Sequence, residues 1–156
     1  MNINIIAVGK VKEKYFQAGI DEYLKRLSRF ADVRITEIKE ESIPDKAGEA
    51  EIAAALKKEG EKILRAAGGY KISLCVEGKK LTSEGLSAKI GETAMKSGEI
   101  SFIIGSSHGL DSAVKEKSDF LLSVSDMTFP HTLARLILTE QLYRAFMISS
   151  GGKYHK

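Results

Sequence analysis

The sequence is poor in cysteine, proline and long apolar runs. Its single cysteine, Cys75, allows neither an intrachain disulfide nor a zinc site built from several cysteines, and it favours a reducing, intracellular compartment. With only 2 prolines against 14 glycines, many tight turns must be made by glycine. The longest apolar runs are about five residues, far below the ~20 that a membrane span needs. No basic segment followed by an apolar stretch opens the chain, so no secretory signal is predicted. We expect a soluble, cytoplasmic protein with no membrane partner.

The remaining composition is that of an ordinary globular domain. The chain has 156 residues, of which 43% are hydrophobic and 29% charged. We expect one domain spanning residues 1–156, large enough to bury its own core.

The positive charge is concentrated near the C-terminus. The formal net charge is +3, and residues 1–126 are balanced, with 20 basic and 20 acidic residues. The whole excess therefore falls in the last 30 residues, which also hold His131 and His155. Either this is a solvated helix with a charged tail, or it is a site for an anionic partner such as an RNA backbone.

Strand-like and helix-like segments alternate along the whole chain. The apolar periodicity predicts strands at residues 2–9, 33–38, 70–76, 100–104 and 120–124, and helices at 14–30, 46–67, 83–96, 111–117 and 130–149. Gly78 is expected to end the third strand, Ser83 to cap the third helix, and Pro130 to be the first residue of the last helix. This alternation predicts an α/β fold, a mostly parallel sheet flanked by helices.

Ligands of such sheets bind beyond the carboxyl ends of the strands, which singles out three loops. These are residues 77–81, 105–110 and 125–130. The second loop, Gly-Ser-Ser-His-Gly, matches the G-x-S-x-G pattern of hydrolases, with Ser107 as nucleophile. It can equally be a plain turn, or a loop whose backbone N–H groups approach a polar cofactor. No dinucleotide or phosphate-loop fingerprint is present, and three scattered histidines predict no metal site.

The last predicted helix carries apolar residues on more than one side, which is typical of a helix that is deeply buried or shared with a partner. Arg144 lies four residues after Glu140, so it can form an ordinary ion pair within the helix. His131 and Arg135 are also four apart, and this spacing suggests an anion between them. The tail, residues 151–156, holds Tyr154 and His155 beside Lys153 and Lys156; such a tail is either disordered or able to contact an RNA base.

Four long segments together resemble the RlmH family, the SPOUT-class methyltransferases of large-subunit ribosomal RNA. They are INIIAVGKVKEKYFQAGIDEYLKRL, LCVEGKKLTSEGL, FIIGSSHGL and MTFPHTLARLILTEQLYRAFMISSGGKYHK, and the resemblance covers essentially the whole chain. It implies a SPOUT fold with a C-terminal trefoil knot and a homodimer. It also implies methyl transfer from S-adenosylmethionine, without a metal, to N3 of a pseudouridine in the subunit-interface stem-loop of 23S ribosomal RNA, within the assembled ribosome.

The resemblance also assigns site residues. The family's cofactor positions fall on Leu74, Gly105, Val124, Ser125, Asp126, Met127, Thr128 and Phe129. One departure is Ser106, where many members have a second glycine. The N3 proton must leave, and His155 is our candidate for the general base. Our candidates for RNA contacts are His131, Arg135, Arg144, Lys153, Tyr154 and Lys156. A small esterase using Ser107 and a non-catalytic ribosome-binding domain remain as alternatives.

Overall fold

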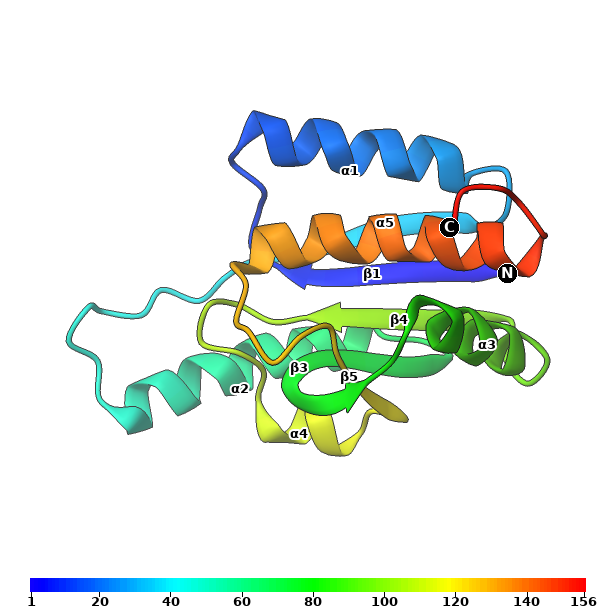
Figure 1. The fold of residues 1–156 in the computed structure, drawn as a ribbon. Helices are drawn as coiled ribbons and strands as arrows, with labels where there is room; N and C mark the ends of the chain where they lie inside the picture. The colour runs from blue at the N-terminus through cyan, green and yellow to red at the C-terminus, as the bar shows by residue number, and fades with distance from the viewer.

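The computed structural model describes all residues from 1 to 156 and is built on one five-stranded sheet (Figure 1). All four strand pairings are parallel, and the strand order is β2-β1-β4-β3-β5. The strands are β1 (Asn2–Val8), β2 (Asp32–Ile38), β3 (Tyr70–Lys80), β4 (Glu99–Ile104) and β5 (Phe120–Ser123). The helices are α1 (Lys14–Leu27), α2 (Glu49–Ala66), α3 (Ser83–Ala94), α4 (Ser112–Glu116) and α5 (His131–Ser149). The predicted α/β class with a parallel, helix-flanked sheet is confirmed.

Helices cover both faces of the sheet, and each face has its own core. Alternate residues of a strand point to opposite faces. Ile3, Ile5 and Ala7 accordingly pack with residues of α1, α3 and α5, including Leu27, Ile90, Leu138 and Leu142. Ile6 and Val8 pack on the other face with Ile63 of α2 and Val114 of α4. Strands β1 and β4 lie inside the sheet, and both are buried along nearly their whole length.

The third strand does not stop at Gly78, as the sequence suggested, but continues to Lys80. Its pairing with β5 is interrupted: Leu74 and Lys79 both face Leu122, so residues 75–78 bulge out of the ladder. A Cβ on Gly78 would lie only 2.7 Å from the carbonyl carbon of Leu122. Gly78 therefore permits close approach of two backbones rather than ending the strand.

Several helix ends also differ from the prediction. The N-cap of α3 is Thr82, not Ser83, because the Thr82 hydroxyl accepts a hydrogen bond from the Gly85 N–H at 3.0 Å. Helix α2 begins at Glu49, after Gly48, rather than at residue 46, and α1 ends at Leu27. Pro130 flanks α5 as its N-cap residue and does not lie within the helix. None of the helices is both long and apolar enough to cross a bilayer.

Candidate functional site

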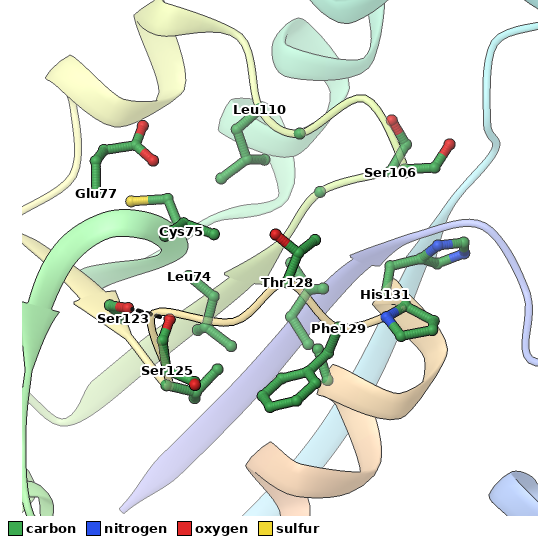
Figure 2. A pocket seen from close by; sticks show the side chains of 18 of the residues that line it. Leu74, Cys75, Glu77, Ser106, Leu110, Ser123, Ser125, Thr128, Phe129 and His131 are labelled. Atoms are coloured by element: carbon green, nitrogen blue, oxygen red, sulfur yellow. Dashed lines mark hydrogen bonds between the residues drawn. The ribbon is translucent and has the colours of Figure 1, made fainter.

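The main cleft of the molecule lies at the carboxyl edge of the sheet and has a volume of about 690 Å³. Three segments line it: residues 74–77, the loop after β4, and the loop between β5 and α5. Side chains from all three surround the same space in Figure 2. Two of these segments fall on the loops 105–110 and 125–130 that the sequence singled out, whereas residues 74–77 share only Glu77 with the expected loop 77–81. The cleft size is in the range of small-molecule sites.

The loop after β4 turns back so tightly that Gly105 cannot carry a side chain. A Cβ there would lie 2.3 Å from the carbonyl oxygen of Gly109, which has a φ of +87°. The Gly109 N–H donates to the Ser106 carbonyl at 2.9 Å, closing the turn. Ser106 is itself buried, and its hydroxyl accepts from the His108 N–H at 3.3 Å. The Ser106 side chain therefore makes a hydrogen bond within the loop rather than pointing into solvent.

The loop between β5 and α5 forms the opposite wall of the cleft. Ser123 donates its hydroxyl hydrogen to the Ser125 carbonyl at 2.9 Å, and the Ser125 hydroxyl accepts from the Met127 N–H at 3.0 Å. These bonds keep the loop compact while the Met127 side chain stays 73% exposed at the cleft mouth.

Seven of the eight residues expected to hold the cofactor line this single cleft. They are Leu74, Gly105, Val124, Ser125, Met127, Thr128 and Phe129. The eighth, Asp126, does not line it. Its carboxylate pairs instead with Lys80 at 2.5 Å, and its side chain is 79% exposed. The Asp126 carboxylate therefore faces solvent rather than the cleft.

The β3 side of the cleft adds residues to which the sequence assigned no role, although Glu77 begins the first of the three expected loops. Cys75 and Glu77 lie in the bulge of β3, and Glu77 forms an ion pair with Lys115 of α4, another lining residue. The hydrogen bond from Lys115 lowers the pKa of the Glu77 carboxyl, whereas burial raises the pKa of the Cys75 thiol. No motif marked these residues, because the bulge depends on how β3 meets β5.

His131 lines the cleft, but Arg135 does not reach it. The Arg135 side chain is only 3% exposed and pairs with Glu37 at 3.1 Å. It also donates to the Gly9 carbonyl at 3.0 Å. In this structure Glu37 and the Gly9 carbonyl engage the Arg135 guanidinium, so it is not a free cation at the cleft, and its phosphate contact stays a prediction.

A buried carboxylate, Glu59, lies behind the cleft. Glu59 is 1% exposed; one of its oxygens accepts from the Glu41 N–H at 2.9 Å, while the other has no partner. Burial raises the pKa of this carboxyl, opposed in part by the Glu41 N–H. The one hydrogen bond that Glu59 accepts is therefore from the Glu41 backbone.

The C-terminal tail packs against its own chain, away from the cleft. The Tyr154 hydroxyl lies 3.2 Å from that of Tyr23 and 3.1 Å from Glu140. His155 Nε2 lies 2.7 Å from Glu84, and His155 Nδ1 lies 3.3 Å from Arg144. No tail residue lines the cleft. Arg144 follows His131 by thirteen residues, about 20 Å along a helix, so His155 is far from its own chain's cleft.

Arg144 forms the ion pair with Glu140 that its spacing suggested, at 2.5 Å. Lys153 and Lys156 are exposed at the end of the chain. Their RNA contacts stay predictions.

The structure does not support the alternative that the loop after β4 is the nucleophile loop of a hydrolase. Ser107 is exposed and makes no hydrogen bond to a histidine, so the nucleophile has no base beside it. No three or more histidine, cysteine or carboxylate side chains come together as metal ligands.

Comparisons with known proteins point in one direction. Residues 1–155 match the family described as "Predicted SPOUT methyltransferase". Ribosomal RNA large subunit methyltransferase H of Streptococcus suis (strain 05ZYH33) is 46% identical over 159 residues, covering 100% of both chains. The proteins of the same name from Streptococcus uberis (strain ATCC BAA-854 / 0140J) and Bifidobacterium animalis subsp. lactis (strain AD011) are 48% and 47% identical, also over 100% of both chains.

Solved structures agree in fold. A probable methylase family protein from Haemophilus influenzae Rd KW20 aligns with a TM-score of 0.55 at 14% identity, covering 99% of this chain and 70% of that one. A probable methyltransferase from Bordetella pertussis Tohama I aligns with a TM-score of 0.52 at 11% identity, covering 92% and 95%. At such identities the likeness concerns the fold alone.

Proposed function

The chain belongs to the RlmH family of SPOUT methyltransferases, and on that premise we propose that it methylates large-subunit ribosomal RNA. The reaction proposed is transfer of the methyl group of S-adenosylmethionine to N3 of a pseudouridine, in the subunit-interface stem-loop of 23S RNA within assembled ribosomes. The observation that carries the proposal is the convergence of seven expected cofactor residues on one cleft. The trefoil knot implied by the family stays a prediction.

The cleft fits S-adenosylmethionine in size and in chemistry. Its apolar walls, including Leu74, Ile104, Leu110 and Phe129, suit an adenine ring, and Gly105 leaves the backbone open to close approach. Among its few charged side chains, Glu77 and Lys115 form one ion pair at the rim. We assign this pair to the ammonium and carboxylate of the methionine part, since it offers one partner of each sign. When bound, the cofactor supplies a methyl group already activated by its positive sulfur.

The protein's own task is then positioning. Holding a base nitrogen in line with the methyl group contributes up to ~7–11 kcal/mol of barrier lowering by proximity alone. The cleft residues would fix the cofactor, and the RNA would be held by groups outside it. His131 lines the cleft, and we propose that it contacts the RNA entering there. We also propose phosphate contacts for Arg144, Lys153 and Lys156, which lie in the C-terminal region, outside the chain's own cleft.

Removal of the N3 proton requires a second copy of the chain, if His155 is the base. The chain's own His155 is held by Glu84 and Arg144, outside the cleft. We therefore propose a homodimer, as the resemblance implies, in which the tail of one chain lies at the cleft of the other, so that the base comes from the second chain. The cleft mouth is suited to such a partner, because Val76, Val124 and Met127 expose apolar surface there.

The proposal is tested by supplying purified protein with labelled S-adenosylmethionine and three acceptors: assembled ribosomes, free 23S RNA and small subunits. We expect cofactor binding by calorimetry and label transfer to ribosomes only. Cofactor binding without transfer to any acceptor would refute the ribosomal substrate. Absence of binding would refute the methyltransferase assignment of the cleft.

A further inference from the structure

The connection from β1 into α1 carries a group of exposed basic and aromatic side chains, here called the Lys10–Tyr15 strip. Lys10, Lys12 and Lys14 are all exposed. Tyr15 is 71% exposed and is the only aromatic among the strongly exposed large hydrophobic residues. Its ring packs edge-on against Phe16 at 4.6 Å between centroids, which holds it at the surface.

The lysines of this strip are unpaired, as most lysines of the chain are, so the strip is distinguished by having three of them within residues 10–14 beside Tyr15. Lys62, Lys80, Lys96 and Lys115 each pair with a carboxylate, whereas Lys10, Lys12 and Lys14 form no ion pair or side-chain hydrogen bond. The only acid within the strip is Glu13, one of whose oxygens is buried.

Acids on neighbouring elements neutralise the strip only in part. Glu37 is engaged by Arg135, and the exposed Lys39 follows β2 at the same edge of the sheet. Glu40 is exposed and lies at the start of the strip, since its Oε2 is 3.4 Å from the position of a Cβ on Gly9, the residue before Lys10. With Glu13 and Glu40 set against Lys10, Lys12, Lys14 and Lys39, this surface keeps a net positive charge beside an exposed aromatic ring.

This surface adjoins the cleft. Strands β1 and β4 are parallel neighbours, with Ala7 opposite Ile104, so the residues following both leave the sheet at one edge. The position of a Cβ on Gly9 is 3.6 Å from Nε2 of His131, a cleft residue, and Lys10 follows directly. Figure 1 shows the β1–α1 connection leaving the same end of the sheet as the β4–α4 connection.

We propose that the Lys10–Tyr15 strip binds the RNA that flanks the target nucleotide. Free lysines contact phosphates, and an exposed aromatic ring stacks on an unpaired base; together they form the usual chemistry of single-stranded RNA recognition. The strip lies outside the C-terminal region to which the sequence confined the RNA contacts. This inference rests on the proposed ribosomal RNA substrate and extends its footprint to the N-terminal end of α1.

The experiment measures affinity for ribosomes over a range of salt concentrations for Lys10→Gln/Lys12→Gln. Each lost phosphate contact lowers the salt slope by about 0.7–0.9, so the slope should fall by roughly 1.5 and the affinity several-fold. The matched control is Lys25→Gln/Arg29→Gln, which removes two exposed cations at the other end of α1 and should retain the wild-type slope. Equal slopes and affinities for both variants would overturn the inference.

Two further variants test the stacking part. Tyr15→Ala should lower ribosome affinity several-fold, whereas Tyr15→Phe, which keeps the ring, should retain it. Loss in both would show that the hydroxyl acts and would contradict stacking. All variants should bind S-adenosylmethionine like the wild type by calorimetry. Failure of the wild type itself to bind cofactor or methylate ribosomes would instead refute the proposed function.

Discussion

At the scale of single residues, Gly105 is a cleft position with no room for a side chain. A Cβ would lie 2.3 Å from the backbone oxygen of Gly109, so the loop itself must move. We expect Gly105→Ala to weaken binding of S-adenosylmethionine by at least about tenfold, or ~1.4 kcal/mol. Calorimetry with Gly91→Ala as control checks this, because an added Cβ on Gly91 meets nothing within 4 Å. Equal affinities would show that the loop does not contact the cofactor.

Arg135 is expected to matter for stability rather than for RNA binding. Its guanidinium is buried and joins α5 to the ends of β1 and β2 through Gly9 and Glu37. Replacing it with Ala should cost about 2–3 kcal/mol, because charge-assisted hydrogen bonds are lost while the Glu37 carboxylate left behind is 40% exposed and stays hydrated. The comparison is Arg34→Ala, whose pair with Glu99 is 66% exposed on the arginine side and should contribute about 0–1 kcal/mol. Denaturant unfolding of both variants measures the difference; similar losses would contradict the structural role.

Glu59 predicts a dependence of stability on pH. Because its pKa is raised in the folded state, the stability it contributes is complete below the unfolded pKa of about 4.3 and is lost as pH rises through the folded pKa. From pH 4 to pH 7 the Glu59→Gln variant should therefore become more stable relative to the wild type. The reason is that Gln carries no charge at either pH, and its carbonyl oxygen accepts from the Glu41 N–H as the carboxylate does. Unfolding free energies at both pH values provide the test. If the difference in unfolding free energy between the two proteins stays constant or shrinks as pH rises, the pKa of the Glu59 carboxyl is not raised in the folded state.

At the scale of elements, α5 connects two places with different roles. Its N-terminal end presents His131 to the cleft, and its C-terminal half holds the tail through Glu140 and Arg144. Its apolar residues on more than one side are explained within the chain, since α1 and α3 both pack against it.

The tail should loosen when the Tyr154 hydroxyl is removed. Tyr154→Phe deletes the contacts with Tyr23 and Glu140 but keeps the ring against Tyr143, whose centroid is 4.9 Å away. We expect faster release of the last residues by carboxypeptidase. Tyr143→Phe is the control, because the Tyr143 hydroxyl makes no hydrogen bond within the chain; an unchanged rate for Tyr154→Phe would contradict the contact.

The elements themselves could be predicted from sequence because each has its own periodicity. Features that depend on distant partners could not. The continuation of β3 past Gly78 depends on the backbone of β5, and the burial of Arg135 depends on Glu37, 98 residues earlier. Seven cleft residues could be named in advance because the family resemblance marks them. Cys75 and Lys115 could not, and Glu77 was given no role, because only the bulge of β3 brings these side chains together.

At the scale of the whole molecule, the separation of cleft and tail makes the dimer a requirement of the proposed mechanism. Mixing two inactive variants tests this. In a dimer of Gly105→Ala with His155→Gln, the intact cleft of one chain meets the intact tail of the other. After subunit exchange at equal amounts, we expect about a quarter of the wild-type rate, since half the dimers are mixed and each has one working site. Full activity of a monomer, or no recovery on mixing, would contradict a site shared between subunits.

The most direct test of the central claim is mass spectrometry of 23S RNA fragments from ribosomes incubated with the protein and S-adenosylmethionine. The account predicts one added methyl group, located on N3 of a single pseudouridine in the subunit-interface stem-loop, and its absence with Gly105→Ala. Ribosomal RNA of unchanged mass after incubation with the wild-type protein, or a methyl group elsewhere, would contradict it.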